Sequence, residues 1–122
     1  MEGVILSDAD LTGAKLKRAD MYWAYCYGAK MEGADLESAD LSGAILREVN
    51  FRGANLKDAK FGPDNVGGGA ELAGADLSSA LIEGAVFDRA TYSSATRFPE
   101  GFDPVSRGMI LGNSVTGETL PR

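Results

Sequence analysis

The sequence carries an apolar residue at every fifth position over most of its length. These residues, which we call the centres, recur without a break from Leu6 to Phe61 and again from Leu72 to Tyr92. Two positions before each centre stands an alanine or, at positions 4 and 49, a valine. The remaining positions hold mainly Asp, Asn, Lys, Ser, Thr and Gly. Seventeen five-residue units can be read in this way, so the chain is a tandem repeat.

A period of five residues fits neither an α-helix nor a straight strand. Five steps of about 100° on an α-helix rotate each centre by about 140° from the last, so no apolar face forms. On a strand, five steps turn the side chain to the opposite face. The centres all point inward only if the chain bends once in every unit, and a bend of roughly 90° closes a four-sided coil after four units. The pattern therefore predicts an all-β solenoid of about four coils, with glycine favoured at the bends because it accepts positive φ.

One irregular segment interrupts the repeat, because Phe61 and Leu72 stand eleven rather than ten positions apart. Val66 lies five positions after Phe61, so we interpret it as a further centre, with the three glycines that follow absorbing one extra residue as a bulge. The alternative is that residues 62–71 loop out entirely, which would move every later centre by one face. With Val66 inside, the expected interior columns are Leu6, Cys26, Leu46, Val66 and Phe87; Leu11, Met31, Phe51, Leu72 and Tyr92; Leu16, Leu36, Leu56 and Leu77; and Met21, Leu41, Phe61 and Ile82.

The triplets Ala9-Asp10-Leu11, Ala39-Asp40-Leu41 and Ala54-Asn55-Leu56 resemble the Ala-Asp/Asn-Leu signature of the pentapeptide-repeat family. That resemblance implies a right-handed quadrilateral β-helix, the handedness being taken from the family. Residues 96–104 also resemble tails found on cyanobacterial members. We expect a repeat domain at residues 1–97, with its irregular segment at 62–71, followed by a capping or flexible tail at 98–122.

The two ends of the predicted solenoid differ. At the C-terminal end, apolar residues of the tail are expected to fold back over the core, because a bare end exposes core and backbone edges. These residues are Phe98, Phe102, Met109, Ile110 and Leu111. Residues 113–122 are expected to be disordered. The N-terminal end has no comparable cap, since the repeat begins almost at Met1.

Composition excludes several kinds of chemistry. The 122 residues include no histidine and one cysteine, Cys26, so the chain forms neither an internal disulfide nor a zinc site of Cys and His ligands. Histidine-dependent acid–base and nucleophilic catalysis are excluded as well, and the glycines at 67–69 lack the pattern of a phosphate-binding loop. We expect no catalytic, cofactor or metal site, no small-molecule substrate and no enzymatic activity. Cys26 is expected to be a buried, unreactive thiol.

The distribution of charge limits the kinds of partner that the chain is expected to bind. The formal net charge is −6, and basic residues are interspersed with acidic ones along the repeat. This distribution favours a well-solvated surface and disfavours nucleic acid or an anionic membrane as a direct partner. The sequence has no apolar run long enough to cross a membrane and no signal-peptide pattern at its start, so we expect a cytoplasmic protein.

One outward column departs from the polar pattern of the other faces. On the first face, the position before the centre holds Ile5, Tyr25 and Ile45, and the expected register continues it to Asn65 and Val86. Exposed apolar patches often mark partner sites, and Tyr and Trp are favoured anchors. The alternative is that the column only stabilises neighbouring strands. With the aromatic residues beside it, the candidate interaction surface comprises Ile5, Tyr22, Trp23, Tyr25, Tyr27 and Ile45.

The third face has a different character. Its expected outward columns are Lys15, Asp35, Asn55 and Asp76, and Lys17, Glu37, Lys57 and Ser78. Opposite charges alternate along them, and exposed ion pairs of this kind are worth only about 0–1 kcal/mol each. We interpret this face as a solvated surface.

These features predict a non-catalytic structural or protein-interaction module. Its partner would be an unknown protein or a second copy of the chain, bound through the apolar face or an end of the solenoid. The family resemblance offers an alternative, because some members imitate a DNA duplex in shape and charge and bind DNA gyrase. An acidic mimic of DNA that binds a type II topoisomerase would need a longer rod with denser acidic charge, so the first interpretation is favoured.

Overall fold

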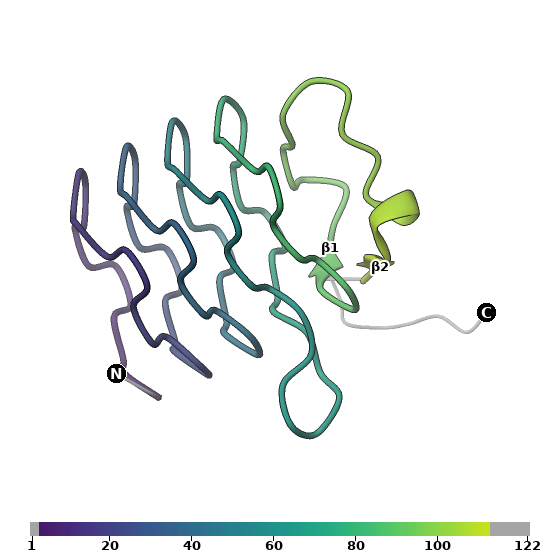
Figure 1. The fold of residues 1–122 in the computed structure, drawn as a ribbon, viewed down its shortest axis with the longest axis horizontal. Coiled ribbons are helices and arrows are strands. Elements are labelled where there is room, and N and C mark those ends of the chain that lie inside the picture. The colour runs from purple at the N-terminus through teal and green to yellow at the C-terminus, as the bar shows by residue number, and fades with distance from the viewer. Residues whose placement is uncertain (1–2, 113–122) are drawn as a thin grey trace.

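The chain winds into stacked four-sided coils, as the spacing predicts. The computed structural model describes residues 3–112, and Figure 1 shows the coils side by side along the long axis of the molecule. Each face contributes one residue that pairs in parallel with the residue twenty positions later, for example Ile5 with Tyr25 and Tyr25 with Ile45. The Leu6 N–H donates to the Tyr25 carbonyl at 2.7 Å, and the Tyr25 N–H donates to the Val4 carbonyl at 2.8 Å. The backbone ladder therefore runs between coils on every face.

Two short strands and one helical turn lie near the C-terminal end. Strand β1 (Thr91–Tyr92) pairs in parallel with strand β2 (Ile110–Leu111), and the 3₁₀ turn η1 (Val105–Arg107) precedes β2. Figure 1 shows β1 and β2 next to each other at the last coil.

A tight turn forms each corner of the coil. The N–H of the alanine that opens a unit donates to the carbonyl of the preceding centre, as from Ala29 to Cys26 at 3.0 Å. The residue two positions after the centre then adopts a positive φ, which is 69° at Gly13. Non-glycine residues adopt the same conformation where the corner requires it, for example Trp23 at 61° and Arg89 at 64°. Each non-glycine residue with a positive φ lowers the stability of the fold by about 1 kcal/mol. Closure of the coil therefore outweighs the backbone preference of these residues.

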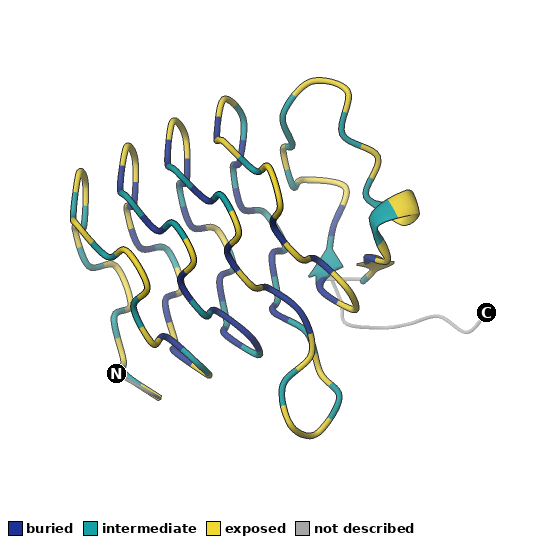
Figure 2. Ribbon diagram, in the orientation of Figure 1, coloured by how far each residue is buried: buried dark blue, intermediate teal, exposed yellow. Residues whose placement is uncertain are grey.

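The centres and their alanines fill the interior. Cys26, Met31, Leu36 and their alanines have no exposed surface, which confirms the predicted burial of Cys26. Phe61 and Phe87 stack with ring centroids 4.9 Å apart. Figure 2 shows buried segments recurring along the inner coils. Each large centre removed from water contributes on the order of 1.5–3 kcal/mol, so the repeat builds one continuous core.

The irregular segment is a loop, and the interpretation of Val66 as a centre is wrong. The side chain of Val66 is 79% exposed. The Ala70 N–H closes the corner by donating to the Phe61 carbonyl at 3.0 Å, so residues 62–69 replace the two-residue turn found at other corners. Parallel pairs across this corner join residues twenty-six positions apart, as Ile45 with Glu71. The loop projects at the lower edge of Figure 1.

The looped-out alternative holds with narrower bounds than the expected 62–71, because Ala70 is buried and Glu71 pairs with Ile45. As that alternative required, every later centre moves by one face. The stack of Phe87 on Phe61 places Phe87 in the fourth column rather than the first. The backbone pairs of Leu46 with Glu71 and of Leu72 with Thr91 place Leu72 and Tyr92 in the first column. By the same ladder Leu77 lies in the second column and Ile82 in the third. The centres still point inward because a whole number of faces was shifted.

Residues 98–112 lie against the last coil. The Phe102 ring packs edge-on against Phe87 at 5.2 Å and stacks on Phe98 at 4.7 Å. The Arg107 guanidinium sits 5.0 Å from the Phe102 centroid and donates to the Ala85 carbonyl at 3.2 Å. Met109 is buried, whereas the side chains of β2 are exposed and that strand contributes through its backbone. The expected disorder of residues 113–122 lies outside the described residues.

Candidate interaction surface

The apolar column of the first face is shorter than the sequence predicts. Ile5, Tyr25 and Ile45 are joined by parallel backbone pairs, so their side chains project side by side from successive coils. Ile5 is 74% exposed, Tyr25 is 42% exposed and Ile45 is half-buried. Below Ile45 the ladder continues to Glu71 and Thr91. The apolar column therefore ends after three coils.

The two residues predicted to extend this column lie elsewhere. Asn65 belongs to the projecting loop, and Val86 pairs with Lys60 on the fourth face. Both errors follow from the register, because a loop at residues 62–69 moves the later units by one face. Val86 is 41% exposed at its new position.

Tyr27 lies on the same face, beside the column, at the position after Cys26. Its ring is 39% exposed, and its neighbour Tyr25 stands on the other side of the buried thiol. The Glu48 carboxylate beside Tyr27 raises the pKa of its hydroxyl, so the phenol is neutral at physiological pH. We define the first-face patch as Ile5, Tyr25, Tyr27 and Ile45.

Tyr22 and Trp23 contact the chain itself. The Trp23 indole Nε1–H donates to Oδ2 of Asp64 at 2.7 Å, and the Asn65 N–H donates to the Tyr22 hydroxyl at 2.5 Å. The two aromatic rings lie 5.1 Å apart. These polar atoms hold the loop against the corner, so Tyr22 and Trp23 border the first-face patch rather than belong to it. The spacing of the repeat carried no signal for this contact.

The loop itself is held from both sides. Oδ1 of Asp64 accepts hydrogen bonds of 2.9 Å from the N–H groups of Val66 and Gly68. The bond from Trp23 and the backbone N–H groups hold the pKa of the Asp64 carboxyl below its ordinary value. On the far side, the Arg89 Nε–H donates to the Gly67 carbonyl at 2.8 Å. Residues 62–69 are thus fixed between the corners that close the first and fourth coils.

An open hollow of about 390 Å³ lies at the C-terminal end of the first face, beside the loop. Arg47 and Arg89 line it, and Arg47 Nε stands 3.2 Å from a Glu71 carboxylate oxygen. The charged groups of the hollow therefore have partners within the chain. Among residues 3–112 no cluster of three or more potential metal ligands occurs.

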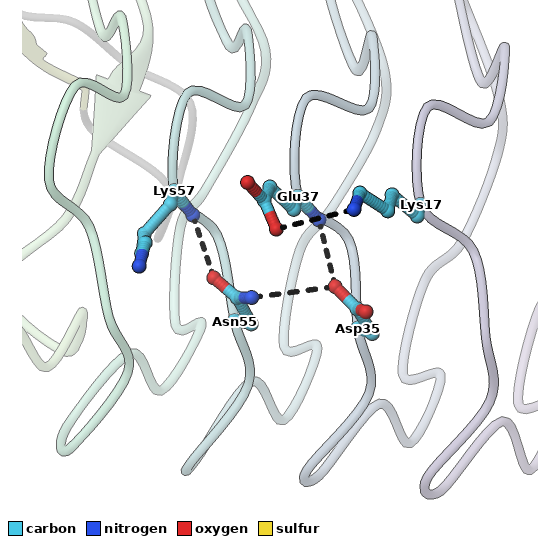
Figure 3. A network of polar contacts seen from close by, with 5 residues as sticks. All are labelled: Lys17, Asp35, Glu37, Asn55 and Lys57. Atoms are coloured by element: carbon cyan, nitrogen blue, oxygen red, sulfur yellow. Dashed lines mark hydrogen bonds and ion pairs between the residues drawn. The ribbon is translucent and has the colours of Figure 1, made fainter.

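The third face is polar in the first three coils, and below them its composition changes with the register. Figure 3 shows its polar contacts: Asn55 Nδ2 donates to Asp35 Oδ1 at 3.4 Å, and Lys17 Nζ lies 3.9 Å from Glu37 Oε1. Below Asn55 the ladder continues to Leu81 rather than to Asp76, and Glu83 rather than Ser78 follows Lys57. Charges of both signs alternate along the upper coils of this face.

No helix within residues 3–112 has the length and apolar character needed to cross a lipid bilayer.

Comparison with known proteins places these features in context. A family profile described as pentapeptide repeats matches residues 1–25 and 24–62, with eight copies. A pentapeptide repeat protein of Nostoc PCC 7120, alr5209, is 33% identical, with 90% of this chain and 82% of that chain covered and a TM-score of 0.44. Rfr23 of the cyanobacterium Cyanothece 51142 is 23% identical over 89% of this chain and 81% of its own, with a TM-score of 0.59. QnrB1, a plasmid-mediated fluoroquinolone resistance protein, is 19% identical over 92% of this chain and 64% of its own, with a TM-score of 0.57. No curated protein sequence matches the chain.

Proposed function

Because the chain belongs to the pentapeptide-repeat family, whose members fold as right-handed quadrilateral β-helices, we propose that it is a non-catalytic module that binds another protein through the first-face patch. One observation carries this proposal. Ile5, Tyr25 and Ile45 occupy consecutive positions of an outward column that is polar at the same level on the other three faces.

The chemistry of the patch suits a protein surface. Ile5 and Ile45 offer aliphatic area, and two neutral phenols, Tyr25 and Tyr27, offer apolar rings with a polar tip. Tyrosine contributes to interfaces because its ring is buried on binding while its hydroxyl keeps a hydrogen-bond partner. The patch sits on paired backbone, so binding there requires little ordering of the chain.

The stabilising role of the same column is the competing explanation. Neighbouring side chains on adjacent strands contribute roughly 0.2–1 kcal/mol per pair. A purely stabilising column predicts that its replacement lowers the melting temperature and leaves every binding partner unaffected. The two explanations therefore differ in a measurable way.

Mimicry of DNA receives less support. Basic side chains stand beside acidic ones on adjacent coils, as Lys17 beside Glu37 and Arg52 beside Asp76. A continuous acidic surface is what a duplex-like potential requires. We therefore do not propose a type II topoisomerase as the partner.

The test compares three immobilised proteins: the wild type, Ile5→Asp/Ile45→Asp, and the matched control Ser38→Asp/Ser79→Asp. The control adds the same charge at exposed positions of other faces. Each protein is incubated with an extract of the source organism, and retained proteins are quantified by mass spectrometry. A partner retained by the wild type and the control but lost from the first variant supports the proposal. Equal retention by all three, with equal circular dichroism, contradicts it.

A further inference from the structure

The N-terminal end of the solenoid is an open β-edge in the part of the chain that the structure describes. Among residues 3–112, no hydrogen bond uses the N–H groups of Asp10, Lys15 or Asp20. The N–H groups twenty positions later all donate to carbonyl oxygens of the first coil, at 2.8–3.0 Å. The carbonyl oxygens of Thr12 and Lys17 likewise accept no bond from residues 3–112. Such an edge is a template for pairing with another chain.

The core is also open at this end. The first-coil centres Leu6, Leu11 and Leu16 are only partly buried, whereas the centres beneath them in the second coil have no exposed surface. In Figure 2 the chain is teal and yellow over the first three faces of the first coil, and dark blue begins on its fourth face, where Met21 has no exposed surface. Apolar side chains and unpaired backbone groups thus share one end of the molecule.

We propose that this edge binds a second copy of the chain, edge to edge, in a twofold dimer. Stacking of the first coil on the opposite end of another copy is blocked, because residues 98–112 lie there and β2 pairs with β1. Only contact between two N-terminal ends remains, and such a contact closes as a dimer instead of growing into a fibre. The surface differs from the first-face patch, so either proposal can fail without the other.

Both unpaired N–H groups on the second and third faces find an acceptor in such a dimer, while the carbonyl oxygens of Asp10 and Lys15, which also accept no bond from residues 3–112, stay without a donor. Consider a twofold axis through the corner at Gly13, which brings the second face of one copy over the third face of the other. Thr12 then lies opposite Lys15, and Asp10 lies opposite Lys17. Each unpaired N–H, of Lys15 and of Asp10, faces an unpaired carbonyl oxygen, of Thr12 and of Lys17. The two copies can therefore continue the hydrogen-bond ladder in antiparallel form.

The charges select this axis. Asp10 faces Lys17 of the other copy, and Asp8 stands beside Arg18 of the other copy; symmetry forms each pair twice. All four side chains are exposed. Ion pairs between stacked coils already occur in the molecule, as Lys17 with Glu37 and Arg52 with Asp76.

The other twofold arrangements bring like charges together or form no opposite-charge pair. An axis through the next corner also sets Asp20 opposite Lys17, but it brings Arg18 against Arg18 and Asp8 against Asp8. An axis through the centre of the third face sets Lys15 against Lys17. An axis through the centre of the second face sets Asp10 against Thr12 and forms no pair of opposite charges. Like charges in contact suppress an arrangement, so the axis at Gly13 is favoured.

A charge exchange tests the proposal on the 122-residue chain without an N-terminal tag. The wild type is expected to have twice its 12.8 kDa chain mass by size-exclusion chromatography with light scattering. Lys17→Glu places Glu against Asp10, and Asp10→Lys places Lys against Lys17. Each single variant is expected to weaken the dimer at least ~10-fold. An equimolar mixture of the two variants is expected to recover the dimer mass, because each Glu then faces a Lys.

Lys57→Glu is the matched control, since Lys57 occupies the same outward column as Lys17 but lies away from the edge. It is expected to remain dimeric. Circular dichroism and thermal melting establish that every variant is folded, which matters for Asp10 because its Oδ1 accepts the Thr12 N–H at 3.1 Å.

Three results would overturn the proposal. The first is a monomeric wild type at all concentrations. The second is a dimer unchanged by Lys17→Glu and Asp10→Lys. The third is a pair of monomeric variants that stays monomeric on mixing. A dimer broken instead by Tyr25→Asp/Ile45→Asp, at two patch residues outside the first coil, would assign self-association to the first-face patch. Amide hydrogen exchange gives an independent readout: the N–H groups of Asp10 and Lys15 are expected to exchange more slowly in the dimer than in the folded Lys17→Glu monomer.

Discussion

The indole nitrogen of Trp23 and the carboxylate of Asp64, forty-one positions apart in the sequence, are joined by a hydrogen bond of 2.7 Å. This bond connects the corner that closes the first coil to a loop that leaves the solenoid after the third. Asp64 also caps the turn of its own loop through two backbone N–H groups. A single carboxylate thus sets both the shape of the loop and its position on the solenoid.

Protonation of Asp64 is expected to loosen the loop. The pKa of this carboxyl is lowered in the folded protein from its ordinary value of 3.8, so its contribution to stability is present above that value and is lost as the pH falls through the folded pKa. The emission of Trp23, the single tryptophan, reports the change. We expect a fluorescence transition in acid that begins below pH 3.8.

Asp64→Asn provides the control for this titration, because its side chain keeps its shape and carries no titratable proton. Its fluorescence is expected to lack the acid transition as long as far-UV circular dichroism stays native. Superimposable pH profiles for the two proteins would show that another group governs the emission of Trp23.

Gly43 is expected to tolerate no side chain. A Cβ at this position would lie 2.5 Å from Cδ1 of Trp23, and the residue has a φ of 70°. Gly33 has a φ of 67° with nothing within 4 Å of the same atom. Gly33→Ala should therefore cost about 1 kcal/mol from backbone strain alone. Gly43→Ala should cost a further ~1–3 kcal/mol, because the Trp23 ring must move.

Urea denaturation of the two alanine variants measures the difference. Trp23 fluorescence of the folded Gly43→Ala protein should also differ from that of the wild type, whereas Gly33→Ala should leave it unchanged. Equal stabilities for the two variants would mean that the ring yields at no cost.

The stack of Phe61 on Phe87 is a test of the register. Phe61→Leu and Phe87→Leu are expected to be coupled by about 0.5–1.5 kcal/mol in a double-mutant cycle, because the rings lie 4.9 Å apart and parallel. Leu16→Ala, three coils away from Phe87 along the chain, serves as the control and should add to Phe87→Leu within about 0.3–0.5 kcal/mol. A coupling between the two phenylalanines no larger than in the control would contradict the assigned columns.

Cys26 is expected to resist alkylation in the folded state. Its side chain has no exposed surface, and burial raises the pKa of the thiol to about 11. Because the folded pKa lies above the value of 9.0 for a free thiol, the related stability is complete below pH 9.0 and is lost as the pH rises toward 11.

Iodoacetamide labelling measures this protection. A Cys26→Ala/Ser7→Cys variant carries the thiol on the exposed surface of the same face and should react at least ~100-fold faster at pH 8. Equal labelling rates in the two folded proteins would indicate that the first coils open readily.

The repeat made most of the fold predictable. A centre every fifth residue with alanine two positions earlier determines the bend, the inward side chains and the corner conformation seen at Gly13 and Trp23. The register after Phe61 was not predictable in the same way, because Val66 stands at the spacing of a centre whether or not it is inside. The hydrogen bond from the Ala70 N–H to the Phe61 carbonyl determines the register. A backbone bond of this kind has no counterpart in the pattern of apolar residues.

The candidate surface could be predicted only as far as the pairing between successive coils could be. Ile5, Tyr25 and Ile45 precede the loop, and their alignment requires only the period of twenty. The assignment of Asn65 and Val86 failed because both follow Phe61. The engagement of Tyr22 and Trp23 by the loop depends on a contact across forty-one positions, which no local spacing encodes.

The corner between Phe61 and Ala70 is a joint at which the molecule accepts extra chain. Residues 62–69 leave and return through one hydrogen bond, and the columns below them continue without distortion. The register thus depends on where the added segment ends and is indifferent to how long it is. A foreign peptide could be carried at this corner, displayed on a rigid support, as long as its last residue delivered Ala70 to Phe61.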